Sequence, residues 1–151
     1  MTIASIVGGI AVLLTGVSAG VFFTYQNSVL PGLGTLDDRA FARAMNSMNR
    51  AILNAAFMLF FVGSMIALAA AAILGFVTGG GLAAWLYAAA AVVYQVGVLF
   101  VTGGVNVPLN TALAKDNDRR AFEARWVRWN LVRTLAAIVA FALAIAALIV
   151  V

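Results

Sequence analysis

Charged residues divide the chain into long apolar segments and short polar ones. Residues 1–36, 51–114 and 134–151 contain no Asp, Glu, Lys or Arg. At about 1.5 Å of rise per residue, the shortest of these segments would form a helix of about 27 Å, close to the thickness of a bilayer's hydrocarbon core, about 30 Å. The longest has 64 residues, enough for two helices separated by the glycine run at 79–81.

This pattern predicts an all-α protein with a four-span transmembrane helix bundle. We expect the spans at about residues 3–25, 52–77, 82–102 and 131–151, in a single integral membrane domain that covers 1–151. Because lipid offers no hydrogen-bond partners to the backbone, each span must satisfy its N–H and C=O groups within the helix. The first span lacks a preceding charged segment and is expected to remain as an anchor rather than be cleaved.

Composition supports a membrane protein and excludes much familiar chemistry. Hydrophobic residues make up 65% of the chain and charged ones 9%, against about 25% in soluble globular domains. The chain has no His and no Cys. Imidazole or thiolate metal sites, disulfides and His-dependent nucleophiles are therefore excluded, and we predict neither a metal nor a cofactor.

The basic residues predict the orientation in the membrane. All nine lie in residues 39–50 or 115–133, on one side of the predicted bundle. The positive-inside rule then places both charged loops in the cytoplasm and both termini outside, in the cytoplasmic (inner) membrane. We interpret these charges as contacts to anionic lipid headgroups rather than as a nucleic-acid surface.

Two pairs of matching segments suggest an internal repeat. Gly20-Val21-Phe22-Phe23 begins 11 residues before Pro31, and Gly97-Val98-Leu99-Phe100 begins 11 residues before Pro108. If the match is not due to chance in an apolar chain, each copy is a helical hairpin, and an axis along the membrane normal relates the two.

The second pair lies in the charged loops and predicts two amphipathic cytoplasmic lead-in helices. Arg39-Ala40-Phe41 matches Arg120-Ala121-Phe122, and an Asn follows each Phe after eight residues. Thr35-x-x-Asp38 resembles a capping box for the first lead-in helix, and Asn117 or Asp118 can cap the second.

We predict that two glycines and two prolines have structural roles. Gly16 and Gly20 place a small face on the first span, where another helix can approach closely. That helix belongs either to the same bundle or to a second copy in a homo-oligomer. Pro108, like Pro31, follows a span, and it suits the first turn of a helix that restarts there.

Polar and aromatic residues gather at the cytoplasmic ends of the predicted spans. They comprise Asn106 and Asn110, Trp126, Trp129, Asn130 and Arg133, the stripe Asn46, Arg50 and Asn54 with Asn49 beside it, and Tyr25, Gln26 and Asn27. One interpretation is that they cap helices, snorkel to the headgroups and form an aromatic belt. The other is that they line a pocket for a planar apolar ligand with carbonyl or phenol oxygens. Convergence of the amides and Arg133 on one cavity would favour the pocket.

Several of these motifs resemble the bacterial branch of the anthrone oxygenase-like integral membrane family. The motifs are Ala19-Gly20-Val21-Phe22-Phe23, Pro31-Gly32-Leu33, Met45-x-x-Met48-Asn49-Arg50-Ala51, Asn106-Val107-Pro108-Leu109-Asn110-x-x-Leu113 and Trp129-Asn130-x-x-Arg133-Thr134. The resemblance implies a four-span bundle and, from a few members, oxidation of anthrones to anthraquinones by O2 without metal or flavin. The site residues it implies are Asn49, Arg50, Asn106, Pro108, Asn110, Trp129, Asn130 and Arg133.

One position departs from the family pattern. Many bacterial relatives carry a His directly after the Trp-Asn pair, where this chain has Leu131. Oxidation of an anthrone requires removal of a proton from carbon, for which a group of near-neutral pKa is expected. This departure puts the base, and with it catalysis, in doubt.

Three functions are consistent with these observations. The first is a cofactor-independent oxygenase of anthrone- or phenol-type substrates, with Arg133 and Asn130 as donors to an enolate oxygen and Trp129 as a stacking wall. The second is a non-catalytic membrane module that binds a lipid, a quinone-like molecule or a partner protein. A small exporter is a third, which the absence of a carboxylate inside any span disfavours.

Overall fold

The computed structural model describes residues 2–150, and within them the regular structure is entirely helical. The elements are α1 (Ile3–Thr24), η1 (Tyr25–Val29), α2 (Leu30–Gly34), α3 (Asp38–Ala51), α4 (Ala55–Val77), α5 (Gly81–Tyr94), η2 (Gln95–Phe100), η3 (Thr102–Asn106), α6 (Val107–Asp116) and α7 (Arg119–Ile149). The segments labelled η are π-helical turns inside longer helices.

Four continuous helices in the described part of the chain are long and apolar enough to cross a membrane. They are Ile3–Gly34, Ala55–Val77, Gly81–Asp116 and Arg119–Ile149. The chain is therefore a multi-pass membrane protein with an all-α fold, as its sequence predicts. Three of these helices extend well beyond the predicted spans at the charged end, because the polar segments there continue the helix.

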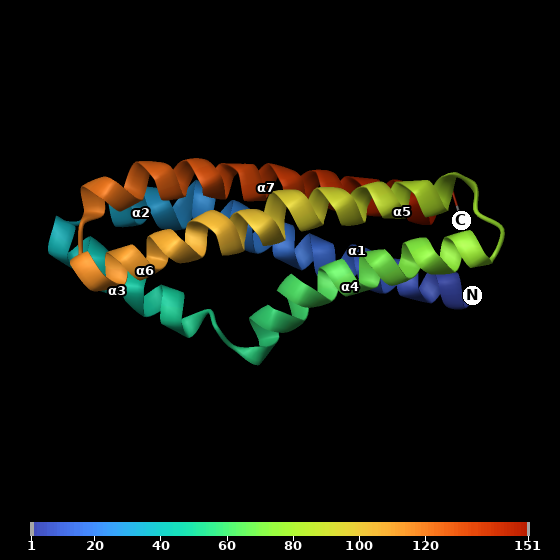
Figure 1. Ribbon diagram of the computed structural model, residues 1–151, viewed down its shortest axis with the longest axis horizontal. Coiled ribbons are helices and arrows are strands. Elements are labelled where there is room, and N and C mark those ends of the chain that lie inside the picture. Colours follow the sequence, from blue (N-terminus) through green and yellow to red (C-terminus); the bar gives the residue numbers. More distant parts are fainter. Residues whose placement is uncertain (1, 151) are drawn as a thin grey trace.

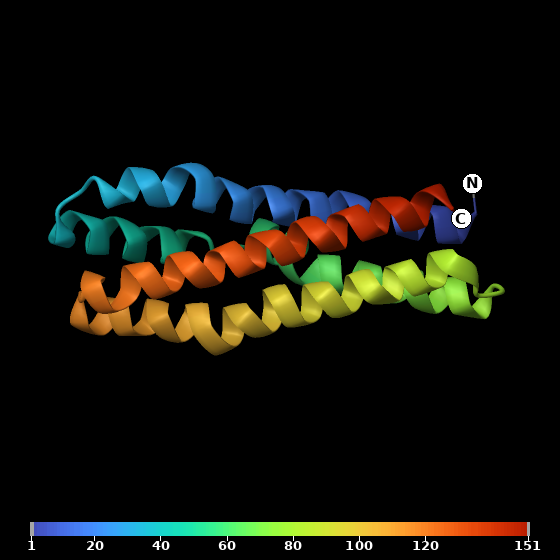
Figure 2. The same ribbon diagram turned by 90° about the horizontal axis from the view of Figure 1, so that it is seen from above.

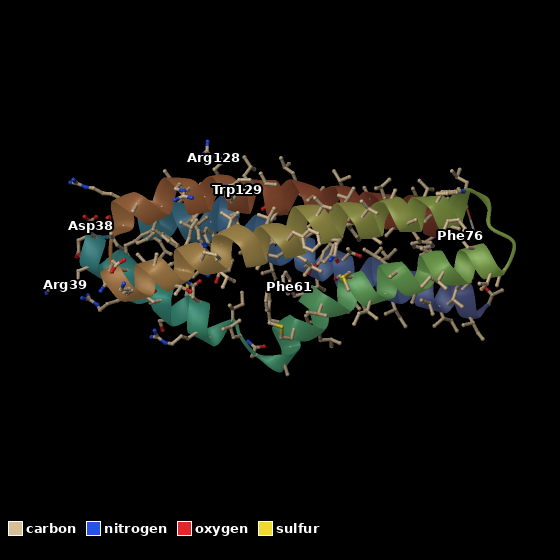
Figure 3. All side chains as sticks on the ribbon, in the orientation of Figure 1. Asp38, Arg39, Phe61, Phe76, Arg128 and Trp129 are labelled. Carbon is tan, nitrogen blue, oxygen red and sulfur yellow. The ribbon has the colours of Figure 1, made fainter. Side chains whose placement is uncertain are left out.

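The helices form a bundle in which α1 packs against α4, α4 against α5, α5 against α7 and α7 against α1. Seen from above, α7 runs obliquely between α1 and the yellow-green helix that contains α5 (Figure 2). Both ends of the chain lie beside the turn between α4 and α5, and the charged segments lie at the opposite end (Figures 1 and 3). Which membrane the bundle occupies, and which end faces the cytoplasm, stay predictions.

Pro108 lies in the first turn of α6, as expected, but α6 continues the preceding helix instead of restarting after a break, and Pro31 likewise lies inside a continuous helix. One residue separates each proline from a preceding π-helical turn. Each turn is closed by a backbone hydrogen bond between residues five apart, from Leu30 N–H to Tyr25 O and from Val107 N–H to Thr102 O. A proline in an α-helix removes one N–H and pushes its ring against the preceding turn. A wider π turn just before each proline relieves that crowding.

The charged-end helices begin at equivalent residues of the two repeat copies. Asp37 caps α3 by accepting a hydrogen bond from Ala40 N (2.8 Å), and Asp118 caps α7 by accepting one from Ala121 N (3.1 Å). The Thr35-x-x-Asp38 capping box is therefore wrong. The hydroxyl of Thr35 donates to Gly32 O at the end of α2 instead (2.8 Å). The matching caps and matching π turns both support the repeat.

The two copies differ most clearly where the first lead-in helix meets its span. They also differ in η2, which has no counterpart in α1, and in the lengths of α2 and α6. In the first copy α3 ends at Ala51 and α4 begins at Ala55, whereas α7 runs without a break. Asn54 holds the break by donating to Ala51 O (2.9 Å) and accepting from Phe57 N (3.0 Å). Its equivalent in the second copy is Leu135, which cannot form such bonds.

This bend points away from the other helices (Figure 1). It also removes Asn54 from the expected stripe with Asn46 and Arg50, because those two residues belong to α3 and Asn54 caps the next helix.

Glycines mark where the helices approach most closely. A Cβ on Gly16 would lie 2.9 Å from the ring of Phe141 in α7, and one on Gly97 would overlap the Cβ of Ala136 in the same helix. A Cβ on Gly20 would meet nothing within 4 Å. Gly16 thus serves packing within the bundle, while the face at Gly20 is open.

A matched pair of substitutions tests this packing. Gly97→Ala should lower the melting temperature in detergent, because the new methyl group overlaps α7 and overpacking typically costs about 1–3 kcal/mol. Gly20→Ala, at the equivalent position of the first copy, should leave it unchanged or raise it, since Ala favours a helix over Gly by about 1 kcal/mol. Equal melting temperatures for the two variants would contradict close packing at Gly97 and an open face at Gly20.

Candidate functional site

Arg133 lies on α7 inside the charged half of the bundle, with a side chain 6% exposed. Its Nη1 donates to Thr102 Oγ1 (3.2 Å) and its Nη2 to Asn130 Oδ1 (2.9 Å). The guanidinium carbon lies 4.8 Å from the ring centre of Phe22 and 5.0 Å from that of Trp126. Arg133 is therefore held between aromatic rings and does not snorkel to the surface.

The charge of Arg133 has no carboxylate partner among residues 2–150. The ion pairs in this part of the chain belong to Arg119, which contacts Glu123 (2.6 Å) and Asp38 (3.4 Å) at the charged end. The Nε of Arg133 is buried without any hydrogen-bond acceptor. A buried, unneutralised cation is costly, and in membrane helices such residues mark functional sites.

Asn130 is fully buried and fixes the position of this guanidinium. Its amide accepts from Arg133 and donates to Gln26 Oε1 (2.9 Å) and to Phe22 O (3.3 Å). Because its amide hydrogens already point to α1 and η1, Asn130 is better suited to hold Arg133 than to bind a ligand oxygen itself.

A cavity of about 310 Å³ opens beside Arg133, between α1, α3, α6 and α7. Its aromatic wall consists of Phe22, Tyr25, Phe57 and Trp126. Its polar wall includes Asn46, Asn49, Arg50, Asn110, Asn130 and Arg133. Trp126 is fixed there by donating from Nε1 to Asn110 Oδ1 (2.7 Å).

The bend between α3 and α4 contributes to this space. Ile52 and Leu53, the residues of the break, line the cavity with Phe57 from the first turn of α4. In the second copy the uninterrupted α7 packs directly on Gly97, whereas the equivalent Gly20 meets no neighbour. The cavity thus lies where the two hairpins differ.

Most of the predicted site residues converge on this cavity, but Asn106, Pro108 and Trp129 do not line it. Those that do are Asn49, Arg50, Asn110, Trp126, Asn130 and Arg133. Trp129, the expected stacking wall, is absent from the lining, and Trp126 one turn earlier takes that place. Asn106 is 1% exposed and has no hydrogen-bond partner for either amide atom, yet it also lies outside the lining.

Phe22, Phe57 and Thr102 are among the lining residues that were not candidate site residues in the sequence. Thr102 opens the π turn η3 and is the repeat equivalent of Tyr25, which also lines the cavity. Alignment of the two copies could have indicated it, because Tyr25 was already a candidate. Phe22 and Phe57 carry no polar signal that distinguishes them from other apolar span residues.

The donor set of the cavity suits an oxygen acceptor rather than a metal ion. Within residues 2–150 no group of three or more His, Cys, Asp or Glu residues is arranged to hold a metal. The cavity lining consists of guanidinium, amide, hydroxyl, aromatic and aliphatic groups. Such groups favour a carbonyl or anionic oxygen on a flat apolar molecule.

The family model described as "Anthrone oxygenase" matches residues 41–143, from α3 into the last quarter of α7. The chain belongs to the anthrone oxygenase family. Searches of curated proteins and of solved structures found no match. The region matched by the anthrone oxygenase model contains every cavity-lining residue except those of α1 and η1.

The unneutralised charge predicts an unusual response to substitution. Arg133→Met should leave the melting temperature in detergent unchanged or raise it, because an apolar side chain of similar length removes a buried charge. Arg119→Met, a matched change on the same helix, should lower it, since Arg119 bonds Leu36 O (2.7 Å) and Gly34 O (3.0 Å) in addition to its two carboxylates. A larger loss for Arg133→Met would show that Arg133 is a structural residue.

Proposed function

We propose that this protein is a membrane-embedded, cofactor-independent oxygenase that oxidises an anthrone- or phenol-type substrate with O2. The observation that carries the proposal is the buried guanidinium of Arg133, which lacks a carboxylate partner and forms part of the wall of an aromatic cavity. Membership of the anthrone oxygenase family supports the same reaction class. We also propose that residues 1–151 act as one membrane domain.

In this proposal Arg133 is the catalytic residue and stabilises negative charge on the substrate oxygen. Removal of a proton from the anthrone carbon opposite the carbonyl gives an enolate, whose electrons then reduce O2. Addition of oxygen at that carbon and loss of water convert one anthrone and one O2 into one anthraquinone and one water. A fixed cation beside the enolate oxygen lowers the energy of the anion without rearrangement during the reaction.

Aromatic side chains and Asn130 have supporting roles. Phe22, Tyr25 and Trp126 would hold a planar ring system against the guanidinium, so that its oxygen faces Arg133. Asn130 is a positioning residue, because its amide links Arg133 to Gln26 on the first helix. Correct orientation of a bound reactant contributes to rate independently of charge.

No lining residue of the cavity is a carboxylate or an imidazole. We therefore assign proton removal to hydroxide that enters through the open side of the cavity, with Arg133 lowering the energy of the anion that forms. We further propose, from the positive-inside rule, that this charged end of the bundle faces the cytoplasm across the inner membrane.

The absence of a lining base favours one alternative function, a non-catalytic module that binds a quinone-like molecule or lipid in the same cavity. The two functions differ in one respect only. A binding module retains affinity for an anthraquinone but consumes no O2.

Oxygen uptake by the purified protein with an anthrone tests the proposed function. Arg133→Met should reduce turnover by about 10²–10³-fold, the usual effect of removing one oxyanion donor. Arg128→Met is the matched control, because Arg128 lies on the same helix and points away from the bundle (Figure 3). Turnover unchanged in Arg133→Met would refute the assignment, and binding of anthraquinone without O2 uptake by the wild type would favour the binding module.

The pH dependence tests the assignment of the base. If hydroxide removes the proton, turnover corrected for the protein-free reaction should rise by about tenfold per pH unit across the neutral range, without a plateau, because the hydroxide concentration rises by that factor. Arg133→Met should show the same slope at a lower rate. A plateau that begins at acid or neutral pH would instead reveal a protein side chain as the base.

A further inference from the structure

The cavity carries two positive charges, and no negative residue lines it. Arg133 lies on its buried wall and Arg50 on its exposed side, in the last turn of α3. Arg50 forms no ion pair or side-chain hydrogen bond within residues 2–150. A ligand of opposite charge is therefore expected.

The acidic residues of the chain are used elsewhere. Asp38 and Glu123 neutralise Arg119, and Asp37 and Asp118 cap helices. Asp116, the fifth, is exposed at the end of α6. Arg119 thus forms ion pairs with two carboxylates at the charged end, whereas the two arginines of the cavity form none within the described residues.

Unpartnered polar atoms on the cavity wall point to the same conclusion. The buried, unpartnered polar atoms of the lining residues are Arg133 Nε and Asn49 Nδ2, and both are N–H donors. Asn49 is the neighbour of Arg50 in the chain. The cavity therefore offers donors at two places, one beside Arg133 and one beside Arg50, so its ligand needs an oxygen acceptor at each.

We propose that the ligand is an aromatic carboxylic acid. A carbonyl or phenol oxygen attached to its ring system binds Arg133, and its carboxylate pairs with Arg50 and accepts a hydrogen bond from Asn49. Arg50 is then a specificity-determining residue that selects carboxylated substrates. This inference rests on the proposed function only in that the ligand occupies this cavity. A carboxylate between a guanidinium and an amide N–H forms charge-assisted bonds that a neutral amide of the same shape cannot match.

Binding of two anthraquinones of the same shape tests the proposal. The protein is placed in phosphatidylcholine nanodiscs, and tryptophan fluorescence, to which the cavity residue Trp126 contributes, reports binding of anthraquinone-2-carboxylate or its carboxamide. The wild type should bind the carboxylate at least about tenfold more tightly. Arg50→Met should abolish this preference and leave affinity for the carboxamide within about twofold, whereas Arg50→Lys should retain much of it.

Control variants separate this inference from its alternatives. Arg43→Met, an exposed change on the same helix outside the cavity lining, should keep the full preference, and Arg133→Met should weaken both ligands. Added phosphatidylglycerol should not remove the preference. Loss of the preference for the carboxylate in phosphatidylglycerol-containing nanodiscs would assign Arg50 to binding lipid phosphate and overturn the inference.

Failure of this inference is distinguishable from failure of the proposed function. Equal affinity of the wild type for the two ligands, or equal losses in Arg43→Met and Arg50→Met, would overturn the carboxylate assignment and leave the cavity as a binding site. Absence of binding by either ligand would overturn both proposals.

Discussion

Within a bilayer the backbone must satisfy its own hydrogen bonds, and each irregular feature of this bundle is a local answer to that requirement. Pro31 and Pro108 each remove a donor, and a π-helical turn before each proline keeps the helix continuous. Where the helix does break, Asn54 bonds the last carbonyl of α3 and an N–H of α4 with one side chain. Asn54 thereby pairs two of the backbone groups that the bend takes out of the helical pattern.

The bend between α3 and α4 is a difference between the two hairpins that has a chemical consequence. The first copy breaks between α3 and α4, whereas α7 continues straight at the equivalent place. As a result, no segment of the first copy fills the space beside Arg133. Aromatic rings enclose the guanidinium, and Asn130 fixes it from the same helix. A charge held in this way is poorly hydrated, so it interacts more strongly with an anion than an arginine in water does.

Distribution of charge distinguishes the stabilising arginine from the functional ones. Arg119 joins the start of α7 to the end of α2 and the start of α3 through the carboxylate of Asp38 and two backbone carbonyls, and it pairs with Glu123 on its own helix. Arg133 receives only neutral partners, and Arg50 receives none within the described chain. The fold thus places two acids at Arg119 and two at helix starts, and leaves the cavity positive.

The sequence by itself determined the number of spans, the side on which the charges gather and the repeat, because these depend on hydrophobicity and spacing along one chain. It also indicated most of the polar residues around the cavity, since an amide or guanidinium near a span end needs a partner. Only the tertiary structure decided that Trp126 rather than Trp129 lines the cavity and that Asn54 leaves its stripe. Those outcomes depend on which face of a helix meets another helix, and residue spacing within one helix does not specify that.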